Sequence, residues 1–169
     1  IGYIDNQRSE FEDSNMAVLN MKLTTLNYNI KFSFPTVSVG NRSKFEAVIG
    51  TQGMRQTNEN FGEELLIPNA TTNDMGFYGT SNYEWGKNII QAGIRFDSRA
   101  ISSITNGIEG EEGYFEAIDK KFQSFNSSLG FKTNLKENLT LRLNTATGFR
   151  APNLAELTSN GVHEGSNRY

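Results

Sequence analysis

Residues of the types that carry out covalent chemistry are few in this chain, and they are scattered. The 169 residues include one histidine, His163, and no cysteine. The absence of cysteine excludes thiolate zinc sites, disulfide frameworks and cysteine nucleophiles. No serine stands in the Gly-x-Ser-x-Gly pattern that presents a nucleophilic hydroxyl on a sharp turn. We therefore predict no catalytic residues, and we expect that the protein is not an enzyme.

One segment contains a cluster of acidic residues. Glu109, Glu111, Glu112 and Glu116 fall within a single Gly- and Glu-rich segment. Calcium is bound by several carboxylate oxygens, so a cluster of this kind is compatible with a calcium site. A solvated loop explains the same residues without any ligand, and we favour that interpretation. The prediction is of no metal site and no cofactor.

Basic residues recur singly, mostly within regularly alternating stretches. The sequence does not indicate nucleic-acid binding, because the net charge is −3 and no Lys/Arg cluster occurs. Cations lining a channel can guide an anionic ligand, and they can equally pair with carboxylates such as Asp97 and Glu84. For any single residue we favour the ion pair. The residues predicted to share the polar side of the alternating stretches are Arg95, Asp97, Lys132, Arg142 and Arg150.

The elements that position these side chains are predicted from a period of two, which indicates β-strands. Alternation is clear in 25–34, 44–52, 76–85, 89–97, 125–135 and 139–144, and the last run continues to Phe149 and Arg150. The first strand could begin as early as Ala17. Connections near 36–43, 86–88 and 136–138 are short or middling, whereas 55–74 and 98–121 are long. We predict an all-β antiparallel up-and-down meander of about six to seven strands.

Two chemically different faces follow from this alternation. One carries Asn, Lys, Arg, Gln and Glu; the other is aliphatic and aromatic, with Phe32, Phe34 and Trp85 near strand ends. Transmembrane β-barrels alternate in this way, with aromatic girdles, short turns on one side and long loops on the other. A soluble β-sandwich also alternates and is the competing interpretation. No run of 18 apolar residues predicts a membrane helix.

The C-terminal stretch carries a specific resemblance. "GFRAPNLAEL", residues 148–157, followed by "SNGVHEGSNRY", residues 159–169, closely resembles a segment of TonB-dependent outer-membrane receptors of the Bacteroidetes type. In that family a late barrel strand runs into G-[FY]-R-A-P-x-[LM]-x-E-L and then into an extracellular loop. "NYNIKFSFP" and "AGIRFDSR" resemble further barrel strands, so the likeness extends over essentially the whole chain.

The resemblance implies the fold and the place of the chain in it. The family has a 22-stranded barrel closed around a plug domain. We therefore expect residues 1–169 to be a partial barrel: a curved open sheet without the plug, the TonB box and the remaining strands. The beginning and the end of the sequence both resemble the middle of a longer protein, which agrees with a fragment. "NLAEL" is expected to form a short helical turn or tucked loop at the barrel mouth.

The resemblance also implies a function. We expect a receptor in the Gram-negative outer membrane, in contact with its lipid, that takes up a scarce nutrient with energy from TonB acting through the plug. A ferric siderophore is the first expected ligand, and the expected ligand-binding residues are His163, Arg150, Asn160 and Arg168. A haem receptor using the His163 imidazole is one alternative, because neutral imidazole is a natural haem ligand. A β-sheet surface binding module, such as an adhesin, is the other.

Overall fold

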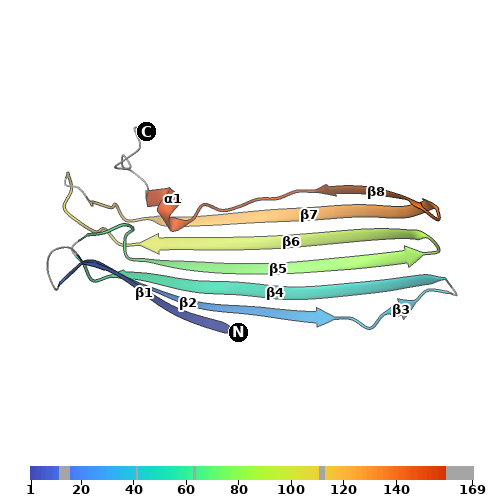
Figure 1. Cartoon of the computed structure of the whole chain (residues 1–169), viewed down its shortest axis with the longest axis horizontal. Coiled ribbons are helices and arrows are strands. Elements are labelled where there is room, and N and C mark those ends of the chain that lie inside the picture. Colours follow the sequence, from blue (N-terminus) through green and yellow to red (C-terminus); the bar gives the residue numbers. More distant parts are fainter. Residues whose placement is uncertain (12–15, 41, 63, 111–112, 159–169) are drawn as a thin grey trace.

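The computed structural model describes residues 1–11, 16–40, 42–62, 64–110 and 113–158. These residues form a single antiparallel sheet in the order β1-β2-β4-β5-β6-β7-β8, with the two-residue β3 paired to β4 (Figure 1). The meander predicted from the sequence is confirmed. The elements are β1 (Gly2–Phe11), β2 (Ala17–Ser33), β3 (Val37–Ser38), β4 (Ser43–Asn60), β5 (Ala70–Trp85), β6 (Asn88–Ser103), β7 (Asp119–Lys136), β8 (Leu139–Ala146) and α1 (Leu154–Thr158).

The sheet has a turn end and a loop end. Tight turns join β5 to β6 through residues 86–87 and β7 to β8 through residues 137–138, both at the turn end. Gly86 has a φ of 57°, a left-handed conformation that glycine adopts without strain. The connections at the loop end run through residues 61–69 and 104–118. The two termini of the sheet, β1 and β8, are both edges, so the described sheet is open.

The predicted long connections, 55–74 and 98–121, are wrong in extent. β4 continues to Asn60 and β5 starts at Ala70, while β6 continues to Ser103 and β7 starts at Asp119. Polar side chains occupy both faces in these strand extensions, as Arg55 and Asn73, ladder partners on the otherwise apolar side, illustrate. The alternation of hydrophobicity therefore disappears where the backbone ladder continues. The strands reach 16–18 residues in β4 to β7, beyond the roughly 9–11 that cross a bilayer.

The sheet buries almost none of its large apolar side chains. Among the described residues only Leu19 and Ile101 are buried core hydrophobics. The register places many of the exposed ones together on one side of the sheet, which we call the apolar face. Its members include Leu26, Ile30, Phe32, Phe45, Ile49, Phe77, Ile94, Phe96, Phe125, Leu129, Leu141 and Leu143. The opposite side, which carries Arg95 and Lys132, is the polar face.

Aromatic side chains gather on the apolar face at the turn end. Phe32 and Phe34 meet edge to face with ring centroids 4.9 Å apart. Trp85 stacks on Tyr83 at 5.4 Å and lies 6.4 Å from Phe131 on β7. Aromatic pairs at these separations add to the stabilisation from burial. Their position beside the short turns is that of the predicted aromatic girdle.

The chain leaves the sheet earlier than predicted at its C-terminal side. β8 ends at Ala146 rather than continuing to Phe149 and Arg150. Residues 147–158, here called the return segment, turn onto the polar face beside β6 and end in α1 (Figure 1). The expected helical turn in "NLAEL" is confirmed.

No helix among the described residues is both long enough and apolar enough to cross a membrane.

Candidate functional site

The return segment and the polar face enclose a groove in the loop half of the sheet. The groove has a volume of about 580 Å³. Its floor comes from β2, β4, β5, β6 and β7, and its wall comes from Phe149, Arg150 and Ala151. We call it the loop-end groove. Because five strands contribute, its shape depends on the strand register and on what fixes the return segment in place.

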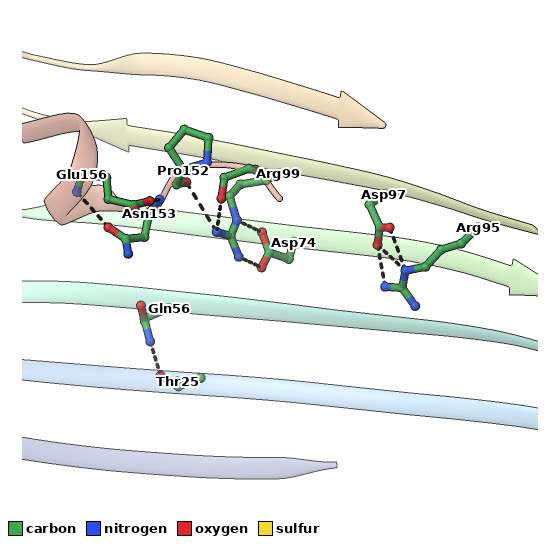
Figure 2. A network of polar contacts seen from close by, with 10 residues as sticks. Thr25, Gln56, Asp74, Arg95, Asp97, Arg99, Pro152, Asn153 and Glu156 are labelled. Carbon is green, nitrogen blue, oxygen red and sulfur yellow. Dashed lines mark hydrogen bonds and ion pairs between the residues drawn. The ribbon is translucent and has the colours of Figure 1, made fainter. Parts of the chain in front are cut away.

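The return segment is held to the sheet at its start, where the Thr147 N–H donates to the Ser127 carbonyl oxygen on β7 at 2.9 Å, and further along by Arg99 on β6 (Figure 2). The Arg99 Nε and Nη2 donate to the two carboxylate oxygens of Asp74 on β5, at 2.7 and 2.6 Å. A bidentate pair of this kind fixes the plane of the guanidinium. The remaining Nη1 then points at the carbonyl oxygens of Ala151 and Pro152, at 3.5 and 3.4 Å. Asp74 therefore orients Arg99, and Arg99 orients the return segment.

The return segment is also fixed internally. The Asn153 side chain accepts from the Glu156 N–H at 2.8 Å, and the Glu156 carboxylate accepts from the Asn153 N–H at 2.9 Å. This reciprocal arrangement is a capping box, which satisfies amide groups that a helix start leaves unpaired. It places Asn153 at the start of α1, directly after Pro152, which has no N–H to contribute to a ladder.

Arg150 closes the same segment through Glu156. Its Nη1 and Nη2 donate to the two carboxylate oxygens at 3.0 and 2.6 Å. The Arg150 hydrogen bonds, together with the one from the Asn153 N–H, hold the pKa of the Glu156 carboxyl below its usual range. The sequence "RAPNLAE" is thus a small self-contained unit, in which one glutamate serves both the arginine and the helix cap.

Arg95 and Asp97 form a third pair on the floor of the groove. Both lie on β6, and the Arg95 Nε donates to Asp97 Oδ2 at 2.7 Å. Opposite them, a Cβ on Gly76 would come within 2.6 Å of the Asp97 carboxylate. The absence of a side chain there makes room for the pair. The Arg95 guanidinium also lies 5.8 Å from the ring centre of Tyr78, within the range of a cation–π contact.

Tyr78 spans the floor from β5 towards β2. A Cβ on Gly50, its partner across the ladder, would lie 2.3 Å from the tyrosine Cζ, so the ring lies flat over the glycine. The tyrosine hydroxyl reaches the Asn29 amide oxygen at 3.5 Å. Nearer the loop end, Gln56 donates to the Thr25 hydroxyl at 3.0 Å (Figure 2). The floor is therefore a connected polar surface with fixed side chains.

A second hollow lies on the polar face near the turn end. Its volume is about 280 Å³, and Lys132, Arg142, Gln91, Asn144 and Ile89 are among the residues that line it. We call it the turn-end pocket. Lys132 and Arg142 are directly opposite in the β7–β8 ladder. Within the described part of the chain, neither has a carboxylate partner among the ion pairs.

The residues predicted from the sequence fall into three groups. Arg95, Asp97, Lys132 and Arg142 share the polar face, as expected, and the Arg95–Asp97 ion pair is present. Arg150 pairs with Glu156 rather than with a residue of the sheet. His163, Asn160 and Arg168 lie outside the described residues, as do Glu111 and Glu112. Among the described residues, no group of acidic, histidine or cysteine side chains is arranged to hold a metal ion.

The comparison with protein families decides the identity. The family model described as TonB dependent receptor-like, beta-barrel, matches residues 2–169. The chain belongs to this TonB-dependent receptor β-barrel family. Comparisons with curated proteins and with solved structures gave no match. TonB-dependent receptors are outer-membrane receptors and transporters that bind ligands and interact with TonB, and they are not a family of enzymes. The resemblance found in residues 148–169 is thereby confirmed.

Sequence reasoning missed four of the residues that hold this TonB-dependent receptor segment together. Asp74, Asn153 and Glu156 were not among the candidate residues, and neither was Arg99. The pairing of Asp74 with Arg99 has a signal in the sequence. Counting outwards from the tight turn at 86–87 brings these two residues opposite each other in the β5–β6 ladder. The pair is nevertheless hidden in the sequence because both residues lie beyond the stretches in which hydrophobicity alternates. The capping box also has a signal in the sequence, because Asn153 is followed three residues later by Glu156, which is the pattern of this motif.

Proposed function

We propose that this chain is part of the barrel wall of an outer-membrane receptor that imports a scarce nutrient with energy from TonB. In this proposal the apolar face contacts lipid, and the polar face lines a wet lumen that a plug domain occupies. TonB acts through that plug. The loop end faces the outside of the cell, where the segment from Arg150 to Arg168 helps to capture ligand. The remaining barrel strands complete the pairing of the edges β1 and β8.

The observation that carries the proposal is the division of an open sheet into two opposite faces. Large side chains such as Ile94 and Leu129 are more than half exposed, at 58% and 55%, in the described residues. A soluble sheet would cover such a surface, because extended apolar patches in water are rare. In lipid every backbone group must be paired internally, which only helices and closed barrels achieve. Membership of the receptor family supports closure into a barrel over coverage by a second sheet.

Two adjacent serines offer a matched test of this orientation. Ser127 lies on the apolar side of β7 and Ser128 on the polar side. Ser127→Cys and Ser128→Cys change each side chain by one atom, and the wild-type segment contains no cysteine. In the full-length receptor, Ser127→Cys should react with a lipid-phase thiol probe and Ser128→Cys with a water-soluble one. Equal reactivity of the two thiols towards both probes would contradict the orientation.

A ferric siderophore is the substrate that we propose for the receptor. Ferric siderophores are often anionic, and the cations of the polar face would favour an anion over a cation. The test is accumulation of radioactive iron by cells that express the full-length receptor, supplied as siderophore complexes of the hydroxamate, catecholate and carboxylate types. We expect accumulation of at least one type in cells with TonB and none without it. Accumulation that is equal without TonB would contradict energised import.

The haem alternative depends on His163, which lies outside the described residues, so it stays a prediction. No described contact favours an adhesin over import. Failure of all three siderophore types, with TonB-dependent uptake of haem iron that His163→Ala abolishes, would replace the siderophore by haem.

A further inference from the structure

We propose that the turn-end pocket is a binding site for a small oxyanion, a carboxylate or a phosphate group. The inference rests on the proposed function in one respect: the polar face must line a wet lumen. It concerns Lys132 and Arg142, whose arrangement differs from that of the arginines in the loop half.

The first step is the position of the two cations. Lys132 on β7 and Arg142 on β8 are directly opposite on the same face of the ladder. Like charges in this position destabilise a sheet, because their side chains lie within a few ångströms of one another. An anion between them would turn this repulsion into two attractive contacts. The arginine contributes a planar fork that matches an oxyanion, and the lysine contributes a mobile point charge.

The carboxylate in the same row of the sheet, that of Glu84, lies two strands away from Lys132. The ladder partners running across the polar face are Lys44, Glu84, Ile89, Lys132 and Arg142. Ile89 therefore separates Glu84 from Lys132, and two strand spacings amount to roughly 10 Å. Glu84 lies opposite Lys44 instead. Of the described residues in this row, none supplies the charge that would neutralise the pair.

The hollow beside the cations has a glycine between two amide side chains. In the next row towards the loop end, Gln91, Gly130 and Asn144 are ladder neighbours. Gly130 is buried, and a Cβ there would meet the Asn144 amide oxygen at 2.8 Å. The glycine thus forms a floor between two amide side chains. Gln91 already donates to Asn82 at 3.2 Å, which holds it in place. Two cations, two amides and a glycine floor give a site with several hydrogen-bond donors and no acid among its described lining residues.

The loop-end groove provides the internal contrast. Arg95, Arg99 and Arg150 each have a carboxylate partner there, so an anion would have to displace an existing ion pair. At the turn end no such displacement is needed. An anionic ligand passing along the polar face would therefore be held at Lys132 and Arg142 rather than at the groove.

The test measures how fast a cysteine in the pocket reacts with charged thiol reagents, because the rate depends on the local electrostatic potential. Asn144→Cys places a single thiol in the pocket of the full-length receptor in outer-membrane vesicles, and Ser128→Cys on the same face serves as the control. Each is treated with an anionic and a cationic methanethiosulfonate reagent that share one reacting group. We expect Asn144→Cys to prefer the anionic reagent by about tenfold over the control thiol. Inorganic phosphate or citrate should slow the reaction relative to chloride at equal ionic strength, and the better competitor identifies phosphate or carboxylate as the preferred group.

Charge removal completes the test. In the Asn144→Cys background, K132Q with R142Q should bring the reagent preference back to that of Ser128→Cys. K31Q should not, because it removes a single cation from the same face but in the row of Arg95, away from the pocket. The conservative pair K132R and R142K should keep the preference, which separates charge from misfolding. A preference near one in the parent, or one that survives K132Q with R142Q, would overturn the proposal. If neither thiol reacts with water-soluble reagents until the receptor is denatured, the wet-lumen orientation itself fails.

Discussion

The two halves of the polar face differ in whether their cationic side chains have carboxylate partners. In the loop half, Arg95, Arg99 and Arg150 are each paired with a carboxylate. In the turn half, Lys132 and Arg142 face each other across a ladder, and the described ion pairs include neither. The same residue types therefore serve different purposes. Paired arginines fix the shape of the wall, whereas unpaired cations leave charge available to something that is not part of the sheet.

This difference follows from the return segment, which is anchored in the loop half and not in the turn half. The return segment contributes carbonyl oxygens and a glutamate to the loop half, and arginines are suited to bridging several acceptors at once. The turn half has short turns of two residues at 86–87 and 137–138 and needs no such anchoring. A cation there has no structural task in the described residues. Variants that remove charge or fill space in each half test this difference.

The largest effect is expected from Asp74→Asn. The change keeps the size of the side chain but removes the charge that orients Arg99, whose side chain is 27% exposed. Loss of the bidentate pair should lower the free energy of unfolding by about 1–2 kcal/mol. It should also speed amide hydrogen exchange at Leu157 in the return segment. Urea unfolding of the receptor in lipid vesicles and mass-resolved exchange measure the two effects.

Asp5→Asn is the matched control for this prediction. Asp5 also pairs with a cation, Lys22, but on the other face and with both side chains about 40% exposed (38% and 41%). Exposed ion pairs of this kind contribute little, so its effect on the free energy of unfolding should be near zero. If Asp74→Asn proves as harmless as Asp5→Asn, the loop-half pairs do not fix the wall, and the contrast between the halves disappears.

A second prediction concerns space rather than charge. Gly50→Ala puts a Cβ 2.3 Å from the Tyr78 ring, so the ring has to leave its position over the glycine and move away from Arg95. Overpacking should lower the free energy of unfolding by about 1 kcal/mol or more. Gly79→Ala, next to the same tyrosine, meets nothing closer than 3.8 Å and is the control. Equal unfolding midpoints in urea for the two variants would show that the ring position is not fixed.

The sequence predicted the fold better than it predicted the site. Alternation at residues such as Leu141, Arg142 and Leu143 reports which face a side chain takes, and that assignment held across the turn half. It reports nothing where both faces are polar, so the extensions of β4 to β7 cannot be distinguished from loops in the sequence. The pairing of Asp74 with Arg99 went undetected for that reason. Which carboxylate meets Arg150 depends on the local conformation of residues 147–158, and a period of two carries no information about that.

A smaller effect, of opposite sign, is expected at the turn end. Arg142→Gln removes one of two like charges that are directly opposite, so the receptor without added anion should gain about 0.2–1 kcal/mol in its free energy of unfolding. Added phosphate should reduce that gain, because it stabilises only the protein that keeps both cations. Urea unfolding with chloride or phosphate at equal ionic strength measures both. A loss of stability in chloride would mean that an acidic side chain elsewhere in the receptor already neutralises Arg142.

The smallest effect is local and depends on pH. Arg150 and the Asn153 N–H lower the pKa of Glu156 in the folded segment from its ordinary value of 4.5. A carboxyl whose pKa is lowered by folding stabilises the folded state above its unfolded pKa. That contribution is lost as the pH falls through the lower folded value. Amide exchange at Asn153 and Leu157, corrected for its intrinsic pH dependence, should therefore accelerate only below about pH 4.5.

Glu156→Gln should show the accelerated exchange already at neutral pH and should remove its pH dependence. The glutamine amide carries no negative charge at any pH, so it cannot form the ion pair with Arg150. Glu137→Gln in the β7–β8 turn changes an exposed carboxyl in the same way at the other end of the sheet and should leave exchange at Leu157 unchanged. Acceleration in both variants would assign the effect to net charge rather than to the cap. Acceleration in neither would mean that contacts with the sheet, including that of Arg99, hold the return segment without the cap.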